Sequence, residues 1–342
     1  MNSKRPTIED VAQRAQVSIK TVSRVLNNAP HVRPTTRDRV RNAARELEYR
    51  PNLSARRLAS NRSFVIGMLY DNPNPDYVTQ IQYGSLRVCR ERGYSLLILP
   101  YDSKSPSLVG EVIGLRRQAT VDGFIVLQPL SDLEELNQQL LEQRIPTVRI
   151  AQRQFEGLPQ ISVGDREAAD RMTEYLIELG HRRIGFIMGH PAHGSSHDRL
   201  EGHRTALERH GIRFESRLVE RGMFDYESGY AGARNLLSLQ PRPTAIFASN
   251  DLMAMAALTA AHEIRLDIPG DLSVAGFDDT SVARFAWPPL TTMRQPIAEV
   301  ARIATESLLR ILEDEHPGDH CLKAEIVRRA STGKPPAAAA AG

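Results

Sequence analysis

The chain has 342 residues, with 44 Lys and Arg against 41 Asp and Glu, for a formal net charge of +3. This length predicts two or three domains with ample apolar core. Residues 1–60 carry 13 basic and 5 acidic side chains, a net of +8, whereas the other 282 residues carry 31 and 36, a net of −5. A basic head on an acidic body predicts a nucleic-acid-binding module joined to a part that binds no nucleic acid.

Cysteine usage and hydropathy exclude several classes of protein. Cys89 and Cys321 are the only cysteines, so neither a disulfide framework nor a CxxC metal pair is available. No 18 apolar residues run together, and residues 1–10 lack the apolar core of a secretion signal. We therefore expect a soluble, cytoplasmic protein with no membrane partner.

Residues 7–27 predict two short helices separated by a tight turn. Thr7 and Asp10 have capping-box spacing, apolar residues follow at helical period, and Ser18 can cap the second helix. The outer face of that helix carries hydrogen-bond donors, one apolar group and no carboxylate: Ile19, Lys20, Ser23, Arg24 and Asn27. Such a face suits a phosphate-lined groove, although two helices of an ordinary bundle have the same spacing.

A third helix is predicted next, opened by Arg33-Pro-Thr-Thr, capped at Thr35 and stopped at Pro51. Three short helices of this kind can enclose one small core. Asn52 to Ser60 contains helix formers, but about eight residues form a marginal helix in water without outside support. This segment is either a solvated linker or a helix that orders on contact.

From Phe64 onward, short apolar runs alternate with amphipathic helices, which predicts α/β architecture with parallel sheets. The first series of apolar runs is FVIGML, SLLIL, GFIVL and TVRI, and the second is RIGFIM, AIFAS and LSVAGF. Two doubly wound lobes fit this better than one large sheet. In such lobes, ligands bind outside the carboxyl ends of the strands.

These features resemble the lactose-repressor type (LacI/GalR family) of bacterial transcription regulators. TIEDVAQRAQVSIKTVSRVLN, TRDRVRNAARELEYRPN and ARRLA are similar to that family's helix-turn-helix, third helix and hinge helix, and the resemblance continues to about residue 330. It implies a helix-turn-helix head with a hinge helix, followed by a periplasmic-binding-protein-like body. It also implies a homodimeric regulator, most often a repressor, that binds a pseudo-palindromic operator and senses a small molecule, usually a sugar. The family's tetramer-forming leucine-heptad helix is absent.

The resemblance predicts the following domains: helix-turn-helix 1–50, hinge 51–62, first lobe 63–162 and 291–320, second lobe 163–290 and 321–331, and a disordered tail 332–342. It also implies that DNA is contacted by Thr7, Ser18, Ile19, Lys20, Thr21, Ser23, Arg24, Asn27, Asn52, Ala55 and Leu58. Leu58 stands at the family's wedge position and would enter the minor groove.

The motifs DNPNPDY, SHDRLEGH, GMFDYESG, SNDLMA and GFDDT resemble the family's effector-binding loops. They carry the effector role to Tyr77, Arg199, Phe224, Asn250, Asp251 and Asp278, to which we add Trp287. Arg and Asp suit vicinal hydroxyls as bidentate partners. Trp287 would stack on a sugar face or fill the junction of the lobes. Where many members have Asp-Arg, this chain has Ala151-Gln152, so a usual polar contact is missing and the ligand's identity stays open.

The other candidate sites are weak. His190, His193 and His197 match no metal spacing, which favours a solvated loop, and no glycine-rich phosphate loop follows a strand. No nucleophile stands beside a base, so we expect neither catalysis nor a cofactor. An enzyme on a doubly wound fold would leave the basic head unexplained, and a transport-type sugar-binding protein would need a signal peptide.

Overall fold

The computed structural model describes residues 6–26, 32–49, 62–118 and 120–336, and the chain divides into two units, residues 1–63 and 64–342. The first unit contains α1 (Ile8–Arg14), α2 (Ile19–Leu26) and α3 (Pro34–Glu46). The predicted capping box is confirmed, because Thr7 N donates to Asp10 Oδ2 at 2.7 Å and Asp10 N donates to Thr7 Oγ1 at 3.3 Å. Helix α3 begins at Pro34 rather than after a cap at Thr35, since proline is well suited to a first helical position.

The three helices enclose the small core expected from their apolar spacing. Its buried members are Val11, Ala12, Ala15, Val22, Val25, Val40 and Ala43. Asn27 and the predicted hinge segment, with Asn52, Ala55 and Leu58, lie outside the described residues.

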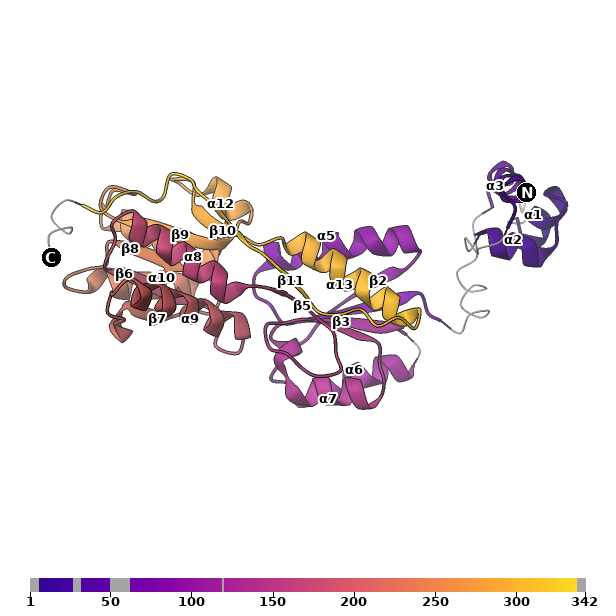
Figure 1. The fold of residues 1–342 in the computed structure, drawn as a ribbon, viewed down its shortest axis with the longest axis horizontal. Coiled ribbons are helices and arrows are strands. Elements are labelled where there is room, and N and C mark those ends of the chain that lie inside the picture. The colour runs from indigo at the N-terminus through magenta and orange to yellow at the C-terminus, as the bar shows by residue number, and fades with distance from the viewer. Residues whose placement is uncertain (1–5, 27–31, 50–61, 119, 337–342) are drawn as a thin grey trace. The chain divides into compact units, whose positions relative to one another are not determined.

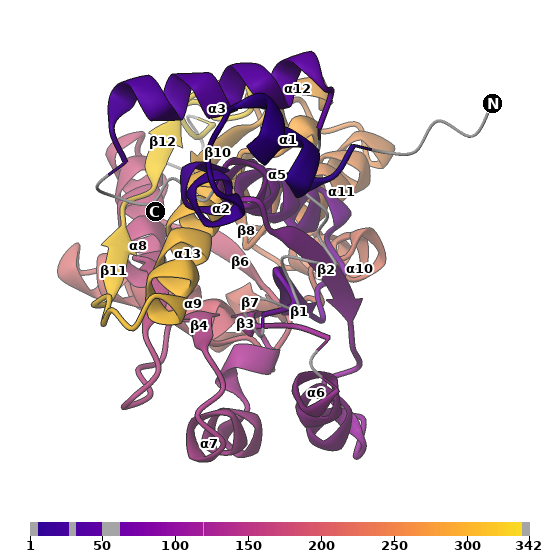
Figure 2. The same cartoon turned by 90° about the vertical axis from the view of Figure 1, so that its right-hand side faces the viewer.

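The first lobe of the body is a six-stranded sheet in the order β11-β5-β4-β3-β1-β2, with parallel pairing throughout. Its strands are β1 (Val65–Tyr70), β2 (Ser95–Pro100), β3 (Gly123–Leu127), β4 (Thr147–Ile150), β5 (Gln160–Val163) and β11 (His320–Leu322). Helices α5 (Pro75–Arg92) and α13 (Ile297–Leu312) cover one face, and α6 (Leu108–Arg117) and α7 (Glu134–Glu142) cover the other (Figures 1 and 2). A 3₁₀ turn, Leu130–Asp132, precedes α7.

The second lobe repeats this plan with the order β12-β10-β9-β8-β6-β7. Its strands are β6 (Ile184–Met188), β7 (Val219–Arg221), β8 (Ala245–Ala248), β9 (Ser273–Asp278), β10 (Thr291–Arg294) and β12 (Glu325–Val327), and only the β10–β12 pair is antiparallel. Its helices are α8 (Asp165–Glu178), α9 (Gly194–Arg209), α10 (Tyr226–Ser238), α11 (Asp251–Glu263) and α12 (Ser281–Phe285), with a 3₁₀ turn at Ser216–Leu218. The prediction of two doubly wound lobes is confirmed.

The chain passes between the lobes three times, at places that differ from the predicted boundaries. Strand β10 pairs with β9 in the second sheet, so the return to the first lobe follows Arg294 and not residue 290. The last crossing follows Leu322, because β11 pairs with β5 in the first sheet. Both segments are drawn into sheets because their backbone groups find partners there.

The tail predicted to be disordered from Thr332 begins as ordered chain. Thr332 Oγ1 lies 2.8 Å from Thr291 Oγ1, and the carbonyl of Gly333 lies 2.9 Å from Nε2 of buried His181. A buried imidazole needs hydrogen-bond partners, and the tail supplies one.

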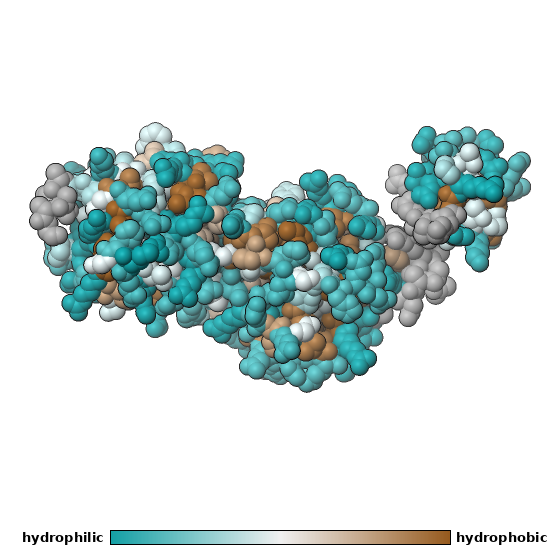
Figure 3. Space-filling model, in the orientation of Figure 1, coloured by the Kyte–Doolittle hydropathy of each residue, from teal (hydrophilic) through white to brown (hydrophobic). Residues whose placement is uncertain are grey.

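The strands at the centre of each sheet are buried on both faces, as their continuous apolar runs predicted. By contrast, a space-filling view of the body shows small apolar patches within a mainly hydrophilic surface (Figure 3). Among the described residues, no helix combines the length and apolar character that a membrane span requires.

Candidate functional site

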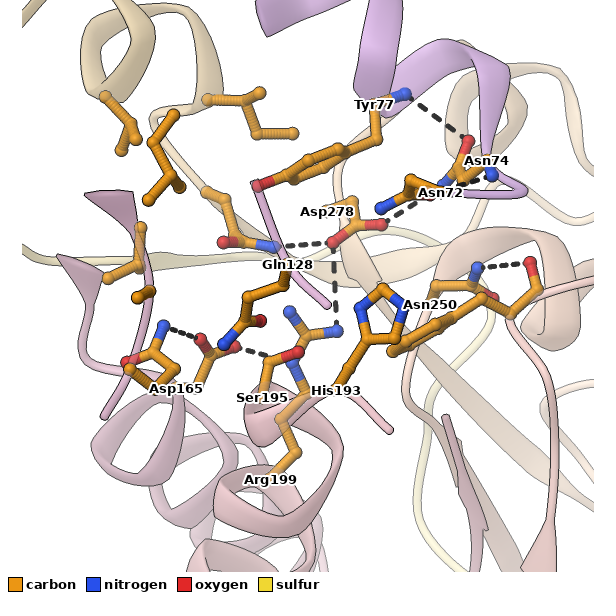
Figure 4. A pocket seen from close by; sticks show the side chains of 18 residues that line it. Asn72, Asn74, Tyr77, Gln128, Asp165, His193, Ser195, Arg199, Asn250 and Asp278 are labelled. Carbon is orange, nitrogen blue, oxygen red and sulfur yellow. Dashed lines mark hydrogen bonds and ion pairs between the residues drawn. The ribbon is translucent and has the colours of Figure 1, made fainter. Parts of the chain in front are cut away.

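A small cavity of about 50 Å³ lies between the two lobes of the body, at the carboxyl ends of the strands (Figure 4). Most of its lining is polar. The polar and aromatic residues at its wall are Asn72, Asn74, Tyr77, Gln128, Gln152, Asp165, His193, Ser195, Arg199, Phe224, Asn250, Asp278 and Gln295. This is the rim where the topology of parallel lobes places ligands.

Arg199 contacts several of the polar groups around this cavity. Its Nε donates to Asp165 Oδ1 at 2.6 Å, its Nη1 donates to the carbonyl of Ser249, and Nη1 lies 4.0 Å from Asp278 Oδ1. The guanidinium also stacks 3.7 Å from the ring centroid of Phe277. Burial opposes its charge, but the neighbouring carboxylates outweigh burial and hold the pKa of Arg199 above its ordinary value.

Asp278 connects the two lobes across the cavity. Its Oδ1 accepts from Gln295 Nε2 at 2.6 Å, and its Oδ2 accepts from Asn74 Nδ2 of the first lobe at 3.4 Å. Burial raises the pKa of the Asp278 carboxyl to about 7, although Arg199 acts in the opposite direction. Asp278 has a φ of 110° and Phe224 a φ of 63°. Residues other than glycine rarely adopt a positive φ unless the surrounding structure requires it, as at binding sites.

Asp165 completes the polar wall on the side of the second lobe. It is the first residue of α8, and its Oδ2 accepts a short hydrogen bond from Gln152 Nε2 of the first lobe. Burial raises the pKa of Asp165, and Arg199 offsets only part of this effect. Gln152 belongs to the Ala151-Gln152 pair that replaces the Asp-Arg of many family members. It nevertheless makes a polar contact at the cavity.

The aromatic and imidazole groups at the wall are uncharged. Burial, assisted by Asp278 and Asp165, raises the pKa of Tyr77 above its ordinary value, so its hydroxyl remains a donor. Phe224 packs edge-on against His193 with ring centroids 5.2 Å apart. Burial is the main cause that lowers the pKa of His193 to about 3, so its imidazole is neutral.

The first lobe also caps a helix of the second lobe. Helix α9 begins at Gly194, and its N-cap residue His193 makes no side-chain cap. Instead, Asp132 Oδ2 accepts from Gly194 N at 3.0 Å. A carboxylate is favourable at a helix N-terminus, so this contact holds the two lobes together at the start of α9.

Five of the seven residues expected to bind an effector line the cavity: Tyr77, Arg199, Phe224, Asn250 and Asp278. Asn250, however, uses both ends of its amide on the protein. Its Oδ1 caps α11 through Met253 N at 2.8 Å, and its Nδ2 donates to the carbonyl of Phe224 at 2.9 Å. Asn250 therefore shapes the wall.

Asp251 and Trp287 do not line the cavity, contrary to our expectation. Asp251 is fully buried, and its Oδ2 accepts from Thr280 N at 2.7 Å and its Oδ1 from Thr292 Oγ1 at 2.5 Å. These bonds join α11 to β10 and to the loop after β9. Trp287 is 81% exposed and neither reaches the cavity nor fills the junction of the lobes.

Sequence reasoning missed part of the wall, including Asp165, His193, Gln152 and Gln295. Asp165 comes two residues after β5, so the rule of searching loops after strands would have found it. His193 belongs to the loop interpreted as solvated, but it is buried against Phe224. No group of three or more His, Cys, Asp or Glu within the described ranges is arranged to hold a metal ion.

In the first unit, the side chains on the outer face of α2 are exposed or half-buried. Ile19 is 47% exposed, Lys20 and Arg24 are exposed, and Thr21 and Ser23 are half-buried. Ser18 accepts from Thr21 N at 3.2 Å, which confirms the predicted cap. An exposed isoleucine beside two cations, with no acidic residue in α2, suits contact with a groove of DNA.

Comparison with known proteins matches both units. Residues 7–52 match the model for bacterial regulatory proteins of the lacI family, and residues 173–332 match the periplasmic binding protein-like domain. The ribose operon repressor of Escherichia coli (strain K12) is 33% identical over 307 residues, which is 89% of this chain and 92% of that protein.

Solved structures extend this similarity to three dimensions. The complex of the transcriptional regulator CelR with cellobiose has a TM-score of 0.71 and 32% identity, and the match covers 96% of this chain and 100% of that one. The lac repressor dimer bound to operator and the anti-inducer ONPF has a TM-score of 0.76 and 29% identity, with the same coverage.

Proposed function

Because the chain belongs to the lacI family of bacterial regulatory proteins, we propose that it is a ligand-controlled transcriptional repressor whose inter-lobe cavity binds a sugar or glycoside. The relatives are transcriptional repressors, so the chain is a DNA-binding regulator and not an enzyme. The observation that supports ligand control is the polar cavity centred on Arg199, which joins side chains of both lobes.

Helix α2 reads the operator in this proposal. Ile19 and Lys20 open the helix and reach base edges, and Arg24 follows one turn later. Contacts to the DNA backbone orient this helix in the groove, and we assign them to Thr7, Ser18, Thr21, Ser23 and Asn27. Two heads of a homodimer then read the two halves of a pseudo-palindrome, as the operator-bound dimer of the lac repressor suggests.

The hinge residues Asn52, Ala55 and Leu58 belong to the proposal as well. A segment too short to be a stable helix alone can fold when two copies pair on DNA. Leu58 then enters the minor groove and bends the duplex, so that binding depends on the separation of the two segments.

The cavity suits a ligand rich in hydroxyl groups. Arg199 and Tyr77 donate hydrogen bonds, Asp278 and Asp165 accept them, and Phe224 offers an apolar face. The free space of about 50 Å³ holds only a few water molecules, so a sugar enters when the lobes part. Opening breaks the contacts of Asn74 with Asp278 and of Gln152 with Asp165, which links occupancy to the arrangement of the lobes.

The DNA half of the proposal is tested by selecting binding sites for the full-length protein from a pool of random duplexes. We expect a pseudo-palindromic site bound by a dimer. A single unsymmetrical half-site bound by a monomer would contradict this expectation.

The ligand half is tested by thermal shift with ribose, other pentoses and hexoses, cellobiose and nucleosides, since a bound ligand raises the melting temperature. Tyr77→Phe removes one hydroxyl from the wall and should reduce the shift, and Arg199→Ala should abolish it. Trp287→Ala is the control. It should leave the shift unchanged, because Trp287 is exposed and does not line the cavity. A shift that survives Arg199→Ala would move the binding site elsewhere.

A further inference from the structure

The charged groups at the cavity wall are unequal in number. In the described part of the chain they are two carboxylates, Asp165 and Asp278, and one guanidinium, Arg199. Each of these side chains is at most 6% exposed. Solvent and salt therefore screen them poorly, and the wall has a net charge of −1 when both carboxyls are ionised.

Arg199 has little charge to offer a bound anion. Its Nε is 2.6 Å from Asp165 Oδ1, and its Nη1 donates to the carbonyl of Ser249. One face of the guanidinium is covered by Phe277 at 3.7 Å. An anionic ligand would have to share a cation that already compensates a buried carboxylate.

The carboxyl group of Asp165 is surrounded by hydrogen-bond donors of the protein. Both of its oxygens accept hydrogen bonds, one from Arg199 and one from the amide of Gln152. As the first residue of α8, it also lies at the favourable end of the helix dipole. Gln152 adds a neutral amide at this point and no second cation.

The N-terminus of α9, one of the helix N-termini at the cavity, is occupied too. Helix α9 begins beside the cavity, and its first amide, Gly194 N, donates to Asp132 Oδ2 at 3.0 Å. Helix N-termini are common anion sites, but here a carboxylate of the protein already takes that place.

We infer that the cavity selects an uncharged, hydroxyl-rich ligand and rejects the corresponding phosphorylated or carboxylated sugar, with Asp165 as the residue that sets this selectivity. The inference rests on the proposed ligand-binding role of the cavity and adds the charge class of the ligand. An anion placed at the wall would face two buried carboxylates with no cation to spare, and like charges brought together in a buried site are strongly unfavourable.

The test uses matched pairs of compounds that differ by one anionic group: D-ribose and D-ribose 5-phosphate, D-glucose and D-glucuronate, and cytidine and its 5′-monophosphate. Thermal shift on the full-length protein at pH 8 identifies pairs with a binding member, and titration calorimetry gives both affinities. This pH lies above the raised pKa, about 7, of the Asp278 carboxyl. We expect the neutral member to bind and its anionic partner to bind at least about 100-fold more weakly.

Two variants locate the selectivity. Asp165→Asn keeps the shape of the side chain, removes its charge and should reduce the difference to below about 10-fold. Gln152→Lys keeps Asp165 and adds a cation beside it, so it should also reduce the difference. It provides the test if the Asp165→Asn protein does not fold. Asp170→Asn is the control, because Asp170 lies on the same helix and pairs with Arg209 at 2.6 Å but does not line the cavity.

The outcomes separate the two proposals. An anionic compound that binds as tightly as its neutral partner would overturn the charge inference and leave the proposed function standing. Unchanged selectivity in both Asp165→Asn and Gln152→Lys would show that Asp165 does not set the selectivity. Binding of no compound from either set would overturn the proposed function and this inference with it.

Discussion

Replacing Arg199 with methionine should destabilise the body strongly and in a pH-dependent way. Methionine retains much of the apolar packing over Phe277 but removes the cation that lies beside two buried carboxyls. Breaking a buried ion pair from one side typically costs about 3–5 kcal/mol, because the remaining charge is left uncompensated. We therefore expect Arg199→Met to lower the free energy of unfolding by about this amount at pH 7.5.

The cost should shrink in acid. Burial already raises the pKa of Asp165 and of Asp278, and Arg199 is the group that limits both shifts. Without Arg199 both pKa values rise further, so the folded state holds protons that the unfolded chain releases above about pH 4. A raised carboxyl pKa means that stability is greatest at low pH and is lost as pH rises through the folded pKa. The variant should therefore lose less at pH 5 than at pH 7.5.

Urea denaturation followed by circular dichroism at the two pH values measures this effect. Arg209→Met is the control, because Arg209 is 44% exposed and pairs with Asp170 and Glu174 on the surface. Such pairs contribute under about 1 kcal/mol. Combining Arg199→Met with Asp165→Asn should recover part of the loss, since both partners are then neutral. An equal penalty at both pH values, or one no larger than that of the control, would refute the reasoning.

Three further predictions concern other parts of the molecule. Asp132→Ala removes a cap worth about 1 kcal/mol, so amide exchange in the first turn of α9 should become about five-fold faster, and an unchanged rate would mean that the contact with Gly194 is unimportant. Asp278→Asn removes a carboxyl whose pKa is raised to about 7, so the stability of the body should fall less between pH 4 and pH 7 than in the parent protein; the same slope in urea titrations would assign that proton elsewhere. Lys20→Ala should change base preference at one or two operator positions by about 1–3 kcal/mol in competition binding, whereas equal weakening on all sequences would make Lys20 a phosphate contact.

Much of the fold could be predicted because its signals are local. The capping box of Thr7 with Asp10 depends on residues three apart, and it forms as its spacing indicates. The apolar runs of the central strands are buried because every side of such a strand must avoid water, wherever in the sheet it lies. The position of Arg199 in the helix after one strand, and of Asp278 at the carboxyl end of another, was likewise enough to bring them to one rim.

Other assignments depended on partners far away in the chain. Asp251 follows a strand and Asp278 ends one, yet Asp251 does not line the cavity, because Thr280 and Thr292 satisfy its carboxylate elsewhere. Trp287 is exposed although its size and rarity suggested a binding role.

Asp165 became part of the cavity only when folding brought Gln152 and Arg199 against it, from 13 residues before and 34 residues after. A sequence determines which groups are apolar, charged or able to cap their neighbours, and therefore which local structures form. Which buried charge meets which partner is decided by packing, because the free energy of a buried carboxylate depends on the donors that the rest of the chain places around it.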